Sequence, residues 1–343
     1  MAIEKEISEV VVEEPFPSRA VPRRRRWLWT LTGMVSAIAL GLFALGWYWS
    51  IEPKPFDVVE AAVQDAEVSD PSELPRGFVT ANTLYRVVKT LLDKPGGYIY
   101  NDLFPPGDLL DNMPSWEYGV IIAARDMATA LRNHFSRAQT QSIEDPDLER
   151  GEPLIYFDPD SWILPTTESQ YRKAEKHFKK YAQRLLEGRA NFYPRADNLH
   201  YYIDLVAKRL GSYGQRLSAS TEQLHVEMFV FTGKQILPRR PVEKTPWLLI
   251  DDIFFEARGH TWALLHFARA IRYDFKRIIE VKGGMAQMEQ LIHELEATQE
   301  PVLSPVVLNG GGFGIFANYS LTLATYIGHA NAAIVDLREL LSI

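Results

Sequence analysis

An uncharged apolar run of 23 residues most constrains what this chain can fold into. Residues 27–49, WLWTLTGMVSAIALGLFALGWYW, contain no Asp, Glu, Lys or Arg. At 1.5 Å per residue, a helix of this length is about 35 Å long, which is enough to cross a hydrocarbon layer of roughly 30 Å. Tryptophan and tyrosine residues at both ends lie where interfacial aromatic belts are found. The run therefore predicts a transmembrane helix.

The charges that flank this run predict its orientation. Arg23–Arg26 precede it directly, whereas the residues that follow include Glu52 and one nearby base, Lys54. Because basic residues stay on the cytoplasmic side, we expect residues 1–26 in the cytoplasm and the rest of the chain in the periplasm. A cleaved signal peptide is the alternative, but its apolar region usually has only about 7 to 15 residues. The sequence thus favours an anchor in a bacterial inner membrane.

The segments on either side of the predicted helix differ from it in composition. Residues 1–22 carry five glutamates and three prolines without a sustained apolar face, so we expect a solvated tail. Residues 50–77 carry seven acids, two bases and four prolines, which predicts an acidic linker with a short element around Val58 to Val68. The remainder, 78–343, is close to neutral. It is expected to form one periplasmic domain.

Helical periodicity dominates this domain. Apolar residues recur at three- and four-residue steps, and Gly-Gly pairs or prolines separate the segments. We expect the pair Gly211 and Gly214 to interrupt one helix, and Gly259 to bend another. Residues 225–231 fit either a strand or a helix. The fold class is therefore all-α, an irregular multi-helix domain behind one transmembrane helix. The predicted helices span approximately residues 80–93, 114–137, 168–188, 199–217, 245–282, 285–299 and 316–341.

Several unusual strings occur in order along the exported part. They are LLDKPGGYIYNDLFPPG (91–107), LDNMPSWEYG (110–119), IDDIFFEARG (250–259), WALLHF (262–267), LNGGGFGIFANYSL (308–321) and NAAIVDLRELL (331–341). With these strings the chain resembles the domain-of-unknown-function 2333 family from about residue 78 onward. The resemblance implies one N-terminal membrane helix and a helical exported domain, and it implies no catalytic residues.

Three residues on one predicted helix face suggest metal chemistry. Asp252, Glu256 and His260 follow one another at four-residue steps, and carboxylate and imidazole groups at such spacing could ligate a divalent cation. A complete site would need a further ligand from a second segment. A solvated polar face, or a structural hydrogen-bond cluster, is the alternative interpretation and is the one that the sequence favours.

A turn-rich stretch between two predicted helices suggests recognition. Tyr98, Tyr100, Phe104 and Trp116 lie among Asp and Asn residues, and aromatic side chains in loops often bind ligands or partners. Packing between helices is the alternative. Gly310–Gly314 approximates a dinucleotide-binding motif, but no βαβ pattern surrounds it, so we expect no cofactor. The stretch 136–142, SRAQTQS, is expected to be an exposed loop.

The function is constrained mainly by what the sequence lacks. Without cysteine, the chain has no disulfide, thiol nucleophile or zinc-thiolate site. It has no P-loop, no nucleophile elbow and no HExxH motif, and its charge pattern gives no reason to expect a nucleic-acid partner. We therefore expect a non-catalytic interaction or scaffold module of the cell envelope, with the lipid bilayer and an envelope protein as partners. A metal-dependent hydrolase acting on envelope material and a lipid or small-ligand binding protein are the alternatives.

Overall fold

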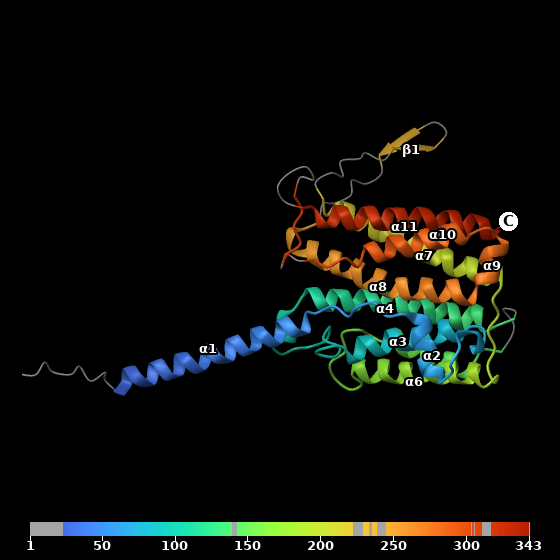
Figure 1. Cartoon of the computed structure of the whole chain (residues 1–343). Coiled ribbons are helices and arrows are strands. Elements are labelled where there is room, and N and C mark those ends of the chain that lie inside the picture. Colours follow the sequence, from blue (N-terminus) through green and yellow to red (C-terminus); the bar gives the residue numbers. More distant parts are fainter. Residues whose placement is uncertain are drawn as a thin grey trace, which may run out of the picture. The chain divides into compact units, whose positions relative to one another are not determined.

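The structure is a computed structural model, drawn in Figure 1, that describes residues 23–138, 143–221, 229–232, 235–238, 245–302, 304, 306–310 and 317–342. The chain divides into two compact units, residues 1–45 and residues 46–343. The predicted tail 1–22, much of the glycine-rich run and parts of the stretches 136–142 and 225–231 lie outside the described residues.

Helices make up most of the described chain, which confirms the all-α fold class. The only strands among the described residues, β1 (Phe229–Thr232) and β2 (Gln235–Pro238), form one antiparallel hairpin. The helices are α1 (Arg23–Trp49), α2 (Val58–Ala66), α3 (Phe78–Asp93), α4 (Asn112–Ala130), α5 (Pro146–Ile155), α6 (Thr167–Leu186), α7 (Ala196–Ala219), α8 (Ile250–Asp274), α9 (Lys276–Val281), α10 (Met285–Ala297) and α11 (Tyr319–Ser342).

Helix α1 contains the predicted span. Residues 27–49 are helical throughout, and an 18-residue window within them has a mean hydropathy of 1.9 and no residue buried inside the protein, whereas Gly46 near the end of the run is buried. A helix of this length and composition can cross a membrane. Its apolar surface would otherwise face water.

The centre of unit 2 is the contact between α4 and α8, which two glycines make unusually close. A Cβ atom at Gly259 would lie 1.9 Å from the carbonyl oxygen of Trp116, and one at Gly119 would lie 2.0 Å from that of Glu256. Only glycine allows two helix backbones to approach this closely. Gly259 therefore serves a close helix contact, and α8 continues past it to Asp274, while the expected bend at this glycine stays a prediction.

Most of the predicted helices are found with small shifts at their ends, but the predicted helix 245–282 is wrong in extent, because α8 begins at Ile250 and ends at Asp274 and α9 is a separate helix. Two further details differ. Helix α7 continues through Gly211 and Gly214 to Ala219, so the predicted break is wrong. Helix α5 was not anticipated, because Gly151 and Pro153 obscure its pattern. Its residues Leu148 and Ile155 are nevertheless buried.

Residues 50–77, expected to be a linker, contribute to the core of unit 2. Helix α2 begins at Val58, which is buried, and Ala61 and Ala62 are buried beside it. Four of the seven acids of this segment belong to α2 or its caps, whereas the small apolar residues of α2 face inward. Unit 2 accordingly begins at Gly46, within the predicted span.

Candidate functional site

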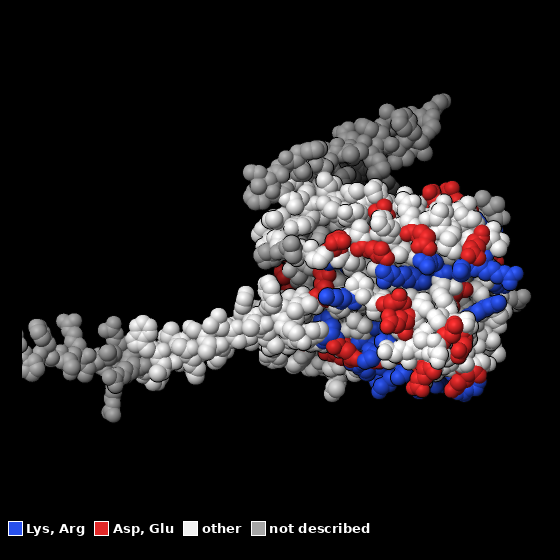
Figure 2. Space-filling view, viewed as in Figure 1, with Lys and Arg blue, Asp and Glu red and all other residues white. Residues whose placement is uncertain are grey.

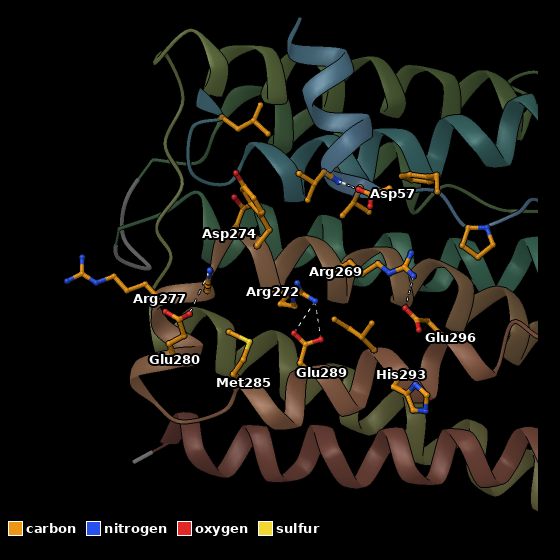
Figure 3. A pocket seen from close by; sticks show the side chains of 18 of the residues that line it. Asp57, Arg269, Arg272, Asp274, Arg277, Glu280, Met285, Glu289, His293 and Glu296 are labelled. Atoms are coloured by element: carbon orange, nitrogen blue, oxygen red, sulfur yellow. Dashed lines mark hydrogen bonds and ion pairs between the residues drawn. The ribbon is translucent and has the colours of Figure 1, made fainter. Parts of the chain in front are cut away.

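A groove with a volume of about 1260 Å³ runs along one side of unit 2, and Figure 3 shows it from close by. One wall consists of residues 55–59 with Leu74 and Arg76. The other walls are the second half of α8, α9 and α10. Pockets for drug-sized molecules usually measure roughly 300 to 1000 Å³. The α8–α10 groove is therefore large enough for a longer ligand, such as a peptide segment.

Helical spacing brings opposite charges to the two helices that face each other across this groove. Arg269 and Arg272 lie one turn apart on α8, and Glu289 and Glu296 lie two turns apart on α10. A guanidinium nitrogen of Arg269 lies 2.7 Å from a carboxylate oxygen of Glu296, and one of Arg272 lies 3.0 Å from a carboxylate oxygen of Glu289 (Figure 3). Partly exposed pairs of this kind contribute about 0 to 1 kcal/mol each. Their arginines can therefore exchange partners at little cost.

Two other carboxylates at the groove are committed to holding helix ends. Asp57 accepts hydrogen bonds from two backbone N–H groups at the start of α2. Asp274 accepts hydrogen bonds from the backbone N–H groups of Gly77 and Thr80 and from the Thr80 hydroxyl. It thereby supplies the cap that α3 lacks in its own sequence. Burial raises the pKa of Asp274 to about 6 against the opposing effect of these hydrogen bonds.

Apart from Asp57 and Asp274, the groove is lined by fewer acidic than basic side chains. The side chain of Glu280 pairs with that of Lys276 at 3.9 Å. The three carboxylates that do not cap a helix, those of Glu280, Glu289 and Glu296, therefore each have a cationic partner. Arg76 and Arg277 line the same groove, are exposed, and form no hydrogen bond or ion pair with a described residue. These two cations line the groove without an ion-pair partner among the described residues, and Arg277 extends away from the other labelled side chains in Figure 3.

Arg258 fixes the segment that leads into this wall. Its guanidinium donates two hydrogen bonds to the carboxylate of Glu52, at 2.7 and 3.1 Å, and two more to the carbonyl oxygens of Thr298 and Glu300 at 2.9 Å. Arg258 is 5% exposed. A buried guanidinium with four acceptors is well satisfied, so this contact holds residues 50–54 against the end of α10.

His266 fixes the next residues of the same segment. Its Nε2 atom accepts a hydrogen bond from the backbone N–H of Phe56 at 3.0 Å, and its Nδ1 atom lies 2.7 Å from the carbonyl oxygen of Trp262. The ring of Phe56 lies 4.1 Å from the imidazole. Burial lowers the pKa of His266 to about 3, so the ring is neutral and Nε2 can accept.

The three residues proposed as metal ligands each have another partner. Glu256 forms an ion pair and two hydrogen bonds with Arg216 and accepts a third from the hydroxyl of Tyr213. Asp252 accepts a hydrogen bond from Ser115 at 3.1 Å. Among the described residues, no group of three His, Asp or Glu side chains is arranged to hold a metal ion. Both carboxylates thus already accept hydrogen bonds from other side chains, and the metal site stays a prediction.

His260 is the most buried of the three. It is 1% exposed, its ring lies 4.7 Å from that of Tyr213, and its Nδ1 atom has no hydrogen-bond partner in the described structure. Burial lowers its pKa to about 3. Its ring therefore packs against α7 and is shielded from solvent.

The four aromatic residues predicted to form a ligand loop divide into two groups. Tyr98 and Trp116 are buried, and the hydroxyl of Tyr98 donates to the carbonyl oxygen of Pro159. Tyr100 stacks on Tyr118 at 5.6 Å. Phe104 is 68% exposed, and its ring lies 6.2 Å from that of Trp162. Of the four, Phe104 is the most exposed and Tyr100 is partly exposed.

Sequence reasoning missed the α8–α10 groove. A repeated charge pattern was present on both helices, but nothing in the sequence says that these two faces oppose each other. Arg76 belongs to the segment that was interpreted as a linker. The i, i+3 spacing of Arg269 and Arg272 was the one signal available before the helices could be placed.

A sequence profile of the domain-of-unknown-function 2333 family matches residues 22–343, nearly the whole chain. The chain belongs to this family. Members are described as uncharacterized proteins conserved in bacteria, so the resemblance found in the sequence is confirmed. No curated protein and no solved structure matches the chain. For this member of the domain-of-unknown-function 2333 family, function has to be argued from the groove and the apolar helix.

Proposed function

We propose that this protein is a non-catalytic interaction module of the bacterial cell envelope, anchored in the inner membrane by residues 27–49. The N-terminus lies in the cytoplasm and unit 2 lies in the periplasm. The α8–α10 groove binds an acidic segment of an envelope protein. The observation that carries this proposal is that Arg76 and Arg277, at the groove, have no ion-pair partner among the described residues, whereas Arg269, Arg272 and Lys276 each have one.

The lining of the groove supports a peptide ligand over a small molecule. Phe56, Val59, Tyr273 and Met285 give it apolar patches between the charges. A protein segment with acidic and apolar residues matches such an alternation, because the charges select the partner and the apolar contacts supply most of the affinity. Ion pairs that cost little to break would let the partner's carboxylates reach Arg269 and Arg272 as well.

The topology has a direct test. A reporter that is active only in the periplasm should be active when fused after Ile343 and inactive when fused before Met1. An N-terminal epitope should stay on the mature protein, because the proposal has an uncleaved anchor. The opposite pair of reporter activities, or loss of the epitope during export, would contradict the proposed placement.

The partner is tested by crosslinking in intact cells. A photoreactive amino acid at His293, an exposed groove residue without a partner among the described residues, should give a discrete adduct with another protein. The same group at Ile143, which is 95% exposed outside the groove, is the matched control. Equal adduct patterns from both positions at equal expression would count against the groove as the binding site.

A further inference from the structure

The exposed apolar side chains of unit 2 gather at one end of its helical bundle. Three loops at this end precede α4, α6 and α8 (Figure 1). Leu103, Phe104 and Leu109 in the first loop are between 54% and 69% exposed. In the second loop Trp162, Ile163 and Leu164 are 44%, 70% and 91% exposed, and in the third Trp247 and Leu248 are 77% and 76% exposed. Soluble surfaces rarely concentrate large apolar residues in this way.

Contacts between the loops and helix starts place them together. The rings of Phe104 and Trp162 lie 6.2 Å apart, which joins the first two loops. The hydroxyl of Ser115, at the start of α4, donates to Asp252, at the start of α8, at 3.1 Å. The first and third loops therefore end at adjacent helix N-termini. Figure 2 shows few charged side chains on the visible part of this end, although the loops also carry exposed acids such as Asp108 and Asp158.

The first loop also packs against the last turn of the apolar helix. A Cβ atom at Gly46 would lie 3.5 Å from Pro106 and 3.6 Å from Leu110, which is ordinary contact distance. Gly46 is three residues before Trp49, hence about 4.5 Å inside the end of the apolar run. Trp47, Tyr48 and Trp49 are the residue types that mark a membrane interface. The loop from Leu103 to Leu110 is therefore level with that interface.

The connection between the span and the folded unit leaves little freedom. Only Ser50 and Ile51 separate Trp49 from Glu52, which Arg258 holds in a bidentate contact. Three extended residue steps cover at most about 10 Å. Unit 2 thus cannot move away from the lipid surface without breaking the contact with Arg258.

We propose that these three loops form a membrane-contacting surface that inserts into the periplasmic leaflet of the bilayer crossed by residues 27–49. The proposal rests on that span being a membrane anchor. The described residues of these loops, 101–112, 158–168 and 245–252, expose the apolar side chains named above and contain eight acids and no Lys or Arg. Insertion is therefore driven by burial of apolar side chains and not by attraction to anionic lipids.

The absence of cysteine allows a direct test on the full chain. Single-cysteine variants Phe104→Cys, Ile163→Cys and Leu248→Cys are labelled with a fluorophore and reconstituted in lipid nanodiscs. Ile143→Cys and Val281→Cys, which replace residues 95% and 77% exposed outside the three loops, are the aqueous controls. Leu40→Cys, on the apolar helix, is the lipid control.

The proposal predicts that iodide quenches the three loop probes several-fold less than the aqueous controls. A nitroxide-bearing lipid should quench the loop probes strongly and the aqueous controls weakly. The values should be the same in zwitterionic and in anionic nanodiscs. The proposal would be overturned if iodide quenched the loop probes as strongly as the probe at Ile143→Cys. It would also be overturned if the loop probes were protected from iodide but were not quenched by the nitroxide-bearing lipid.

The lipid control separates this surface from the anchor. If Leu40→Cys is quenched by the nitroxide lipid and the loop probes are not, residues 27–49 span the membrane and the surface does not insert. If Leu40→Cys is itself not quenched, the anchor fails and the membrane-contacting surface fails with it.

Discussion

Two buried histidines make the stability of unit 2 depend on pH. Burial lowers the pKa of both His260 and His266 to about 3, so both rings stay neutral in the folded protein at neutral pH. In the unfolded chain a histidine binds a proton below about pH 6.5. Their contribution to stability is therefore complete above pH 6.5 and is lost as the pH falls toward 3. Asp274, whose pKa is raised to about 6, has the opposite effect between about pH 4 and 6.

Comparison with a variant isolates one histidine from these mixed effects. On acidification the free energy of unfolding should fall less in His260→Gln than in the wild type. The difference between the two proteins should grow by about 1.4 kcal/mol per pH unit below 6.5 and reach roughly 2 kcal/mol at pH 5. Urea unfolding of the detergent-solubilised full chain at pH 7.5 and pH 5 measures this difference. Parallel pH curves for the two proteins would show that His260 is not neutral and buried as described.

The buried guanidinium of Arg258 gives a second prediction at the residue scale. Arg258→Met removes four hydrogen bonds and leaves the carboxylate of Glu52 without its partner, which should lower the free energy of unfolding by about 3 kcal/mol. Amide hydrogen exchange of residues 50–57 should accelerate. Arg277→Met, which removes an exposed unpaired arginine, should stay within about 0.5 kcal/mol of the wild type. Equal effects of both substitutions would contradict the anchoring role.

At the scale of elements, the contact between α4 and α8 organises the bundle. Gly119 and Gly259 allow the two backbones to touch, and the adjoining side chains of Glu256 and His260 are placed by that approach. Asp252 and Glu256 each have a hydrogen-bond partner outside the candidate metal set, Ser115 for Asp252 and Arg216 with Tyr213 for Glu256.

Alanine substitutions distinguish glycines that are required for close helix packing from glycines beside which there is room for a side chain. Gly259→Ala would place a methyl group 1.9 Å from a backbone carbonyl oxygen, so we expect a loss of about 3 kcal/mol or more in the free energy of unfolding. Gly211→Ala, with its nearest neighbour at 3.9 Å, should instead raise stability by up to about 1 kcal/mol through helix propensity. Thermal denaturation of both variants gives the comparison. Destabilisation of similar size at both positions would contradict the packing argument.

Local patterns predicted the helices because apolar spacing and Gly-Gly stops act within one segment. They could not say which role a glycine plays, since Gly211 and Gly259 look alike until the partner helix is known. They also misjudged residues 50–77, where acidic composition concealed the small inward face of α2. The α8–α10 groove required three separate segments to be placed together, and no single window of sequence contains that information.

At the scale of the whole molecule, two surfaces of unit 2 have different characters. One end is apolar and lies beside the junction with the apolar helix, while the groove on the side carries the unpaired cations. We propose that the apolar end sets the distance of unit 2 from the membrane and its rotation relative to the membrane plane. The groove is then presented to partners that pass close to the periplasmic leaflet.

The central claim is that the two unpaired arginines select an acidic partner. It is tested most directly by the yield of the adduct formed from His293 in intact cells when Arg76→Glu and Arg277→Glu are combined. Arg150→Glu with Lys176→Glu makes the same change in net charge at exposed positions outside the groove. The account predicts that the groove reversal abolishes the adduct and that the control reversal leaves it intact. An adduct that survives the groove reversal at unchanged yield would contradict it.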